Sequence, residues 1–265
     1  MGGPAPPPEQ TAFLDGIQRY AVEGRFGLVP VVRGYVAAAA LRREGDRLRL
    51  AEHEAEEMIV VPLERISPGQ RQALADTGIP LLDCEAGERA HPVVDVQLAA
   101  RAVERRREEL EVAVATALLR SEPDSWLVVD GGLGGLTHLL GSAPRVLGLI
   151  KSHETQFLDG PDLEVAVTLP EGHRSSVFAR RVGGRSSVYT WYLRLWSWED
   201  RDLLHGLVRI ERPATDAALA EATAVSRWLL AERAPLSAPD GRWDRLLYPI
   251  RQVETFLRAQ VGGWW

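Results

Sequence analysis

Carboxylates are the residues of this sequence best suited to chemistry. Residues 126–129 form an unbroken apolar run, as a buried strand requires, and this run delivers Asp130 to a strand end followed at once by glycines. Asp15 lies in an earlier strand-like stretch, and Glu111 lies beside the apolar arc of a predicted long helix. Clustered carboxylates repel one another unless a cation neutralises them, and hard oxygen ligands select Mg²⁺ or Mn²⁺. The pattern favours a metal site that could support phosphodiester cleavage.

Each of these residues also has a structural explanation. Asp-Gly, as at position 130, is a common turn dipeptide. Glu104, Glu108 and Glu111 recur at helical spacing and could form a solvated face laced by arginines. Lys151, at the end of the next predicted strand, could contact a phosphate or be an ordinary strand-end lysine. The residues alone leave these alternatives open.

Several familiar sites are improbable. The sequence contains no CxxC pair, no HExxH and no GxxxxGK[ST], and the glycine-rich residues 131–135 do not fit GxGxxG. The single cysteine, Cys84, lies between Asp83 and Glu85, which would raise its pKa and disfavour nucleophilic catalysis.

The elements that position these residues indicate one α/β domain, residues 11–265, after a disordered proline-rich tail, residues 1–10. Strands are expected at 12–20, 28–41 and 47–63 as an antiparallel meander with turns at Gly24 and Gly45. Further strands are expected at 79–82, 126–129 and 145–151, and extended chain from 163 to 210. Helices are expected at 67–76, 95–120, 215–233 and 242–261.

Composition limits the partners and the compartment. The 265 residues carry a net charge of −6, so the protein is not coated in basic residues for nucleic acid. One cysteine excludes an intrachain disulfide framework, and no segment has the features of a membrane span or a secretory signal, which favours the cytoplasm.

A local basic surface is nevertheless possible, because residues 172–198 contain no acidic residue. This stretch contains both arginines and aromatic residues, a mixture suited to phosphates and stacked bases, or to a hairpin whose aromatics fill the core. The arginines proposed to bind DNA are Arg174, Arg180, Arg181 and Arg185.

Five short motifs, in this order, resemble the NurA nucleases over residues 12–258. They are Phe13-Leu-Asp-Gly16, Arg107-Glu-Glu-Leu-Glu111, Leu127-Val-Val-Asp-Gly131, Leu147-Gly-Leu-Ile-Lys151 and Leu247-Tyr-Pro249. The resemblance implies an RNase H-like mixed sheet flanked by helices and a Mn²⁺- or Mg²⁺-dependent DNA exonuclease or endonuclease. It also implies a homodimer and a hexameric HerA-type ATPase partner in DNA end processing, and residues 264–265, both tryptophan, are candidates for one of these contacts.

By this resemblance Asp15, Glu111 and Asp130 are the metal ligands, and Tyr248 matches the tyrosine of the last motif. The predicted catalytic residues are these three carboxylates together with Lys151 and Tyr248. Two positions depart from the family pattern. Ile17 stands where a small hydroxyl residue is usual. Phe256 stands where a histidine or aspartate is expected, so that either Glu254 substitutes as a ligand or the site is degenerate.

Two other functions therefore compete with the nuclease. One is a catalytically degenerate DNA-binding or assembly subunit of an ATPase complex, for which Phe256 is the motivating feature. The other is an ATPase or sugar kinase of the wider RNase H-like architecture, which would require a further glycine-rich phosphate loop that the C-terminal region lacks.

Overall fold

The computed structural model describes residues 1–85, 87, 89–182, 186–235 and 242–261, and within them the chain forms nine strands and five α-helices. The strands are β1 (Thr11–Phe26), β2 (Val29–Glu44), β3 (Arg47–Val61), β4 (Leu81–Asp83), β5 (Trp126–Asp130), β6 (Val146–Ile150), β7 (Phe178–Val182), β8 (Ser186–Arg194) and β9 (Leu207–Pro213). The helices are α1 (Pro68–Ala75), α2 (Val94–Ser121), α3 (Gly160–Val167), α4 (Asp216–Glu232) and α5 (Tyr248–Gln260), with short 3-10 helices η1 (Leu63–Arg65), η2 (Leu133–Leu136) and η3 (Trp243–Arg245).

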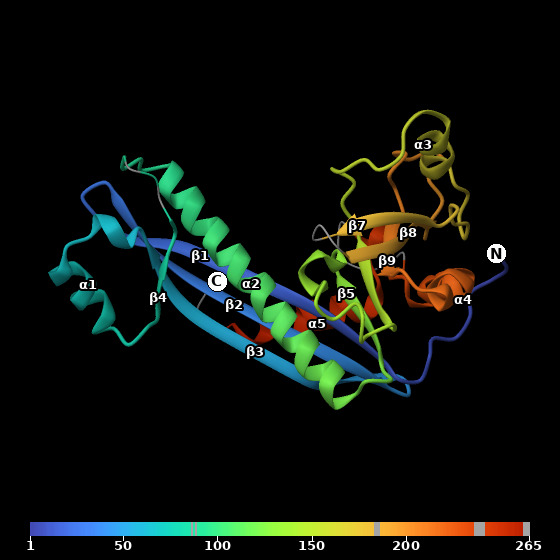
Figure 1. Ribbon diagram of the computed structural model, residues 1–265, viewed down its shortest axis with the longest axis horizontal. Helices are drawn as coiled ribbons and strands as arrows, with labels where there is room; N and C mark the ends of the chain where they lie inside the picture. Colours follow the sequence, from blue (N-terminus) through green and yellow to red (C-terminus); the bar gives the residue numbers. More distant parts are fainter. Residues whose placement is uncertain (86, 88, 183–185, 236–241, 262–265) are drawn as a thin grey trace. The chain divides into compact units, whose positions relative to one another are not determined.

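The strands form one mixed sheet in the order β4-β3-β2-β1-β5-β6-β9-β8-β7 (Figure 1). β5 is parallel to β1 and to β6, whereas β9, β8 and β7 continue the sheet antiparallel. Two-residue loops join β1 to β2 and β2 to β3, which gives the predicted meander. Gly27 and Gly45 occupy these loops with φ of 61° and 64°, a conformation that favours glycine. Two compact units divide the chain.

The first unit comprises Met1–Asp15, Ala40–Glu52 and Ala115–Thr255. All five residues of β6 are buried, which explains why its sequence is wholly apolar. α4, capped by Thr215, covers one face: the Trp228 ring meets Trp126 edge-on at 5.9 Å, and Ser226 Oγ accepts a hydrogen bond from Trp191 Nε1 at 2.9 Å. In the tail, residues 1–10, the Gly3 carbonyl accepts a 2.8 Å hydrogen bond from Arg227.

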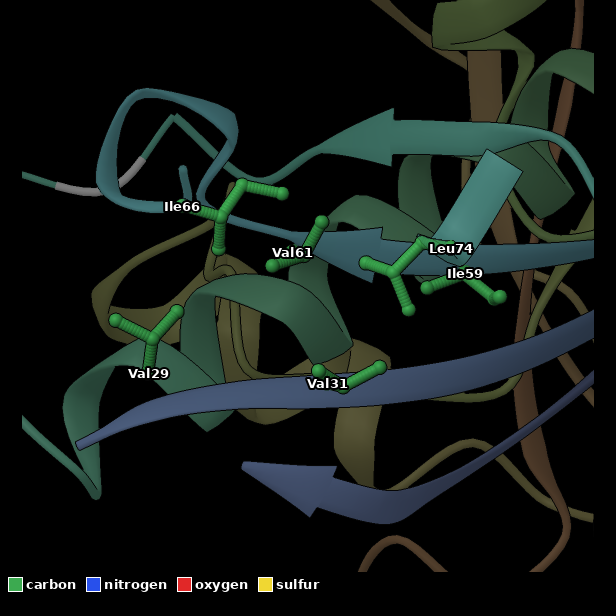
Figure 2. Packing of buried hydrophobic residues seen from close by; sticks show 6 residues of the cluster. All are labelled: Val29, Val31, Ile59, Val61, Ile66 and Leu74. Atoms are coloured by element: carbon green, nitrogen blue, oxygen red, sulfur yellow. The ribbon is translucent and has the colours of Figure 1, made fainter. Parts of the chain in front are cut away.

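The second unit comprises Gly16–Ala39, His53–Val114 and Phe256–Trp265. Its apolar cluster, shown in Figure 2, brings side chains of β2, β3 and α1 together, and its members are Val29, Val31, Ile59, Val61, Ile66 and Leu74. α2 lies against the strands of this unit (Figure 1). Gly34 lies at this contact, and a Cβ there would be only 2.7 Å from Val103 Cγ2. Ser67 and Gln70 form a reciprocal capping box at the start of α1.

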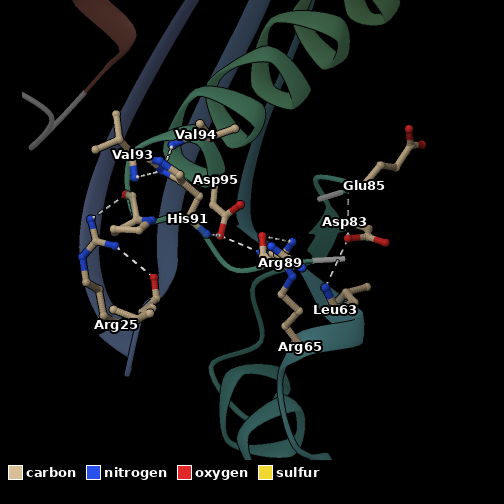
Figure 3. A network of polar contacts seen from close by, with 12 residues as sticks. Arg25, Leu63, Arg65, Asp83, Glu85, Arg89, His91, Val93, Val94 and Asp95 are labelled. Carbon is tan, nitrogen blue, oxygen red and sulfur yellow. Dashed lines mark hydrogen bonds and ion pairs between the residues drawn. The ribbon is translucent and has the colours of Figure 1, made fainter. Parts of the chain in front are cut away.

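A polar network fixes the start of α2 in the second unit (Figure 3). Asp95, in the first turn of the helix, pairs with Arg65 at 2.7 Å and accepts a hydrogen bond from the His91 amide at 3.0 Å. Nearby Cys84 is buried, and burial, followed by the charge of Asp83, raises the pKa of its thiol to about 11. The direction expected from the sequence is confirmed, although burial contributes more than the charge of Asp83, and Glu85 is not among the causes.

Several segments differ from the sequence-based expectation. The helix expected over 242–261, for example, begins only at Tyr248, after the 3-10 helix η3. β1 continues through Gly24 to Phe26, beyond its expected end. The sequence did not predict this extension, because its residues are mostly exposed and carry no hydrophobic pattern. Residues 160–167 form α3 within a region expected to be extended from 163. This helix has only eight residues, too few for a helical period to be recognised.

No helix within the described ranges combines the length and apolar character needed to cross a membrane.

Candidate functional site

Asp15 and Asp130 come to neighbouring positions on parallel strands of the first unit. Phe13 pairs with Val128 and Leu14 with Val129, so Asp15 and Asp130 are the next residues along β1 and β5. Side chains of a strand alternate between its faces, and the two carboxylates therefore share the face of Phe13 and Val128. β5 ends at Asp130 whereas β1 continues, so the pair lies where one strand stops beside another.

Lys151 supplies a positive charge to this pair. Leu149 is the register partner of Asp130 on β6, and Lys151 follows two residues later on the same face. Its Nζ lies 2.6 Å from Asp130 Oδ2, and both side chains are mostly buried, with exposed fractions of 18% and 17%. Asp130 and Lys151, each singled out from the sequence as a strand-end residue, are thus in direct contact.

Glu111 belongs to the second unit and reaches the sheet at Gly16. A Cβ at Gly16 would lie 2.9 Å from the carboxyl carbon of Glu111 and closer still to Oε1, so only glycine leaves room for this carboxylate. Arg107, one turn earlier on α2, pairs with Glu111 and donates a 3.0 Å hydrogen bond to Gln18 of β1. Glu104 and Glu108 are exposed, whereas the Glu111 side chain is 13% exposed.

The donor set suits a hard divalent cation. In the first unit, Asp15 and Asp130 offer carboxylate oxygens on adjacent strands, the ligand type that such a cation prefers. In the second unit, the Glu111 carboxylate fills the space that a Gly16 side chain would take. In the part of the chain that the structure describes, no three such side chains are already grouped closely enough to hold an ion. Lys151 and Arg107 instead supply the cations beside Asp130 and Glu111.

Tyr248 and Pro249 of the last motif, together with Glu254 and Phe256, lie on α5. Tyr248 is its first residue and is 48% exposed, with Pro249 next to it. Glu254 accepts a 3.0 Å hydrogen bond from Arg242, and both belong to the first unit. Phe256, in the second unit, meets the His53 ring edge-on with centroids 5.6 Å apart. His53 Nε2 is buried and has no hydrogen-bond partner among the described residues.

The arginines of the acid-free stretch have different surroundings. Arg174 donates to Thr223 Oγ1 at 3.0 Å and to the Ser175 carbonyl, and burial lowers its pKa. Arg194 is fully buried, donates to four backbone carbonyls, and burial lowers its pKa to about 10. Arg180 pairs with buried Glu211, whereas Arg181 is exposed on β7. Arg185 lies outside the described residues, as do the tryptophans at 264–265.

The aromatics of the same stretch largely serve the core. Trp191 is fully buried and Tyr192 is 4% exposed. The Trp196 ring packs edge-on with Trp243 at 5.5 Å and lies under the Arg233 guanidinium at 3.7 Å. Side chains held in this way are not displayed for stacking on unpaired bases.

Glu211 is a buried carboxylate that the sequence reasoning did not single out. It is fully buried on β9 and accepts hydrogen bonds from the Leu133 amide at 2.9 Å and from Arg209 at 2.5 Å. Burial by itself would raise the pKa of Glu211, but these two donors and the charge of Arg180 outweigh it and hold the pKa below its ordinary value. The sequence offered one signal for Glu211: it lies between Arg209 and Arg212 in a segment, residues 207–213, whose other residues are apolar.

No protein-family model matches the sequence, and no curated protein matches it. The fold matches a solved structure, the NurA nuclease from Sulfolobus solfataricus, with a TM-score of 0.59. The match covers 96% of this chain and 80% of that chain at 11% sequence identity. At this sequence identity the similarity establishes the fold alone. It confirms the predicted fold, an RNase H-like mixed α/β sheet flanked by helices, and the resemblance of that fold to NurA.

Proposed function

We propose that this protein is a Mn²⁺- or Mg²⁺-dependent DNA nuclease whose metal ligands are Asp15, Asp130 and Glu111. One observation carries the proposal: two aspartates come side by side on parallel strands, and the residue after the first is a glycine that makes room for a glutamate. The fold similarity to a nuclease supports the same assignment.

A bound divalent ion would lower the pKa of a water molecule and offset the negative charge of the phosphodiester. Asp15 and Asp130 provide its oxygen ligands, and Arg107 orients Glu111 through their ion pair. Lys151, which pairs with Asp130 Oδ2 in the structure, would be positioned to contact a substrate phosphate if Asp130 bound the ion. We assign Tyr248 a substrate contact and Glu254 an auxiliary ligand role, because both lie on α5 in the unit that carries Asp130.

A second candidate function is a catalytically degenerate NurA-like subunit that binds DNA or assembles with an ATPase. Phe256 favours it, because this aromatic ring packs on His53 and offers no ligand where the family motif has a histidine or aspartate. In either case the proposed setting is cytoplasmic, with a homodimer that docks on a HerA-type hexameric ATPase. Light scattering of the purified protein tests the dimer, and a monomeric mass would contradict it.

The decisive experiment compares Asp130→Asn with Asp124→Asn. Asparagine keeps the size of aspartate but removes the charge that holds the ion, so Asp130→Asn should lower Mn²⁺-dependent kcat/KM about a thousandfold or more. The Asp124 side chain is 86% exposed and precedes the same strand, so its variant should retain activity. DNA cleavage and the melting temperature are measured for both.

Because asparagine leaves Lys151 without its ion-pair partner, a modest fall in melting temperature is expected for Asp130→Asn in any case. Loss of cleavage in a variant that stays folded identifies a metal ligand, whereas a variant that no longer folds identifies a structural turn residue. If the unmutated protein, supplied with Mn²⁺ and its ATPase partner, leaves DNA ends intact, the degenerate-subunit function replaces the nuclease.

A further inference from the structure

Glu211 connects three parts of the first unit through one buried carboxylate. Its Oε2 accepts the Leu133 amide hydrogen, and Leu133 opens η2 just after the turn that follows Asp130. Its Oε1 accepts hydrogen bonds from Arg209, a neighbour on β9, and from Arg180 on β7. A buried carboxylate with several donors is strongly oriented, because each donor fixes a lone-pair direction.

The turn itself is built to receive this carboxylate. A Cβ on Gly132 would lie 3.2 Å from Glu211 Oε2, which is tighter than an ordinary van der Waals contact. Gly148 is the register partner of Glu211. A Cβ on Gly148 would lie only 2.5 Å from the Gly131 carbonyl oxygen, so the absence of a side chain there leaves room for this carbonyl. The Gly131 amide donates to the Leu149 carbonyl at 2.9 Å, and its φ of 116° turns the chain there. The backbone conformation directly after Asp130 is therefore held by the hydrogen bond to Glu211, and it requires glycine at positions 132 and 148.

The two arginines are also held together. Arg180 and Arg209 each lie over the Phe157 ring, at 4.4 and 4.5 Å from its centroid. Two guanidinium groups and one carboxylate leave this cluster with one net positive charge. Arg180 is the more exposed of the two arginines, with 29% of its side chain exposed against 7% for Arg209.

We infer that Glu211 is a positioning residue for the metal ligand Asp130: it clamps the Asp130–Leu133 turn so that the Asp130 carboxylate is held in place before an ion binds. This inference rests on the proposed function. A ligand whose backbone is fixed loses less conformational entropy on binding, so breaking the clamp should weaken the metal site although Glu211 does not touch the ion.

The test compares Glu211→Gln with Glu232→Gln in the full-length protein. Glu232 is a matched control, because it is also a buried glutamate of the first unit paired with an arginine, Arg43, but belongs to α4. The measurements are Mn²⁺ affinity by titration calorimetry, amide hydrogen exchange of the peptide covering residues 127–140, and melting temperature. We expect Glu211→Gln to accelerate exchange in that peptide and to weaken Mn²⁺ binding about tenfold or more, whereas Glu232→Gln changes neither.

Three results would overturn the inference. Unchanged exchange in a folded Glu211→Gln variant would show that the carboxylate does not hold the turn. Faster exchange with unaltered Mn²⁺ affinity would show that the turn does not control the site. Equal weakening in Glu232→Gln would indicate a general effect of lost stability. A wild-type protein that binds no Mn²⁺ would instead overturn the proposed function itself, and with it the catalytic purpose of the clamp, whatever the exchange data.

Discussion

At the scale of single residues, Gly16 controls whether Glu111 can reach β1. No other residue could stand there without displacing the glutamate, because its Cβ would enter the space of the carboxylate. The Glu111 carboxylate is the end of a flexible side chain, so a larger residue at position 16 would move the carboxylate without disrupting β1. The effect of a substitution at Gly16 should therefore appear in function before it appears in folding.

Gly16→Ala should lower Mn²⁺-dependent cleavage about tenfold or more while leaving the protein folded. Neither Gly16 nor Gly24, also on β1, has a positive φ, so alanine fits the backbone at both. At Gly24 it should stabilise by up to about 1 kcal/mol through the unfolded state, whereas at Gly16 the displacement of Glu111, which pairs with Arg107, offsets this gain. A Cβ at Gly24 meets nothing within 4 Å, which makes Gly24→Ala the matched control. Equal activity of the two variants in a cleavage assay would remove Glu111 from the site.

At the scale of elements, the strands β9 and β7 and the turn after β5 are joined by the ionised form of Glu211. Its pKa is lower in the folded protein than the ordinary value of 4.5, because the Leu133 amide and the arginines outweigh burial. Ionisation therefore favours folding: the stabilisation is fully present above the unfolded-state pKa and is lost as pH falls through the folded-state pKa.

The stability difference between wild type and Glu211→Gln should accordingly be larger at pH 7 than at pH 3. Glutamine does not titrate, so the variant lacks this component of the pH dependence. Urea denaturation of both proteins at the two pH values measures the difference. If the difference in unfolding free energy between the two proteins were the same at pH 7 and pH 3, the fold would not selectively stabilise the charged form of Glu211.

The same scale shows what the sequence can and cannot reveal. Helix α2 and strands β5 and β6 were predictable to within one or two residues, because their apolar residues follow a helical period or an unbroken run. The exposed end of β1 and the short α3 were not, since neither carries a hydrophobic pattern long enough to identify. Asp130 and Lys151 were recognisable as strand-end residues, whereas Glu211 was hidden because its partners come from three separate segments.

At the scale of the whole molecule, the charge distribution decides how DNA could be held. The chain has a net charge of −6, so long-range attraction to a polyanion is absent and any DNA affinity must come from local arginines. Most of the described arginines in the acid-free stretch, residues 172–198, already bind other groups of the protein. Arg174 donates to Thr223, Arg180 pairs with Glu211, and Arg194 donates to backbone carbonyls. Arg181 is the exposed exception on β7, the last strand of the sheet.

Arg181→Ala should therefore weaken DNA binding several-fold and lower the slope of log affinity against log salt by about one, the amount expected for one lost phosphate contact. Arg47→Ala is the control, because Arg47 is a strand arginine of the same unit with 79% of its side chain exposed. Both variants change the net charge equally, so only a direct phosphate contact distinguishes them. Arg180→Ala is unsuitable for this purpose, since it removes a partner of the buried Glu211 carboxylate and would destabilise the protein. Fluorescence anisotropy across a salt series measures the slopes, and coincident curves for Arg181→Ala and Arg47→Ala would exclude Arg181 from the DNA path.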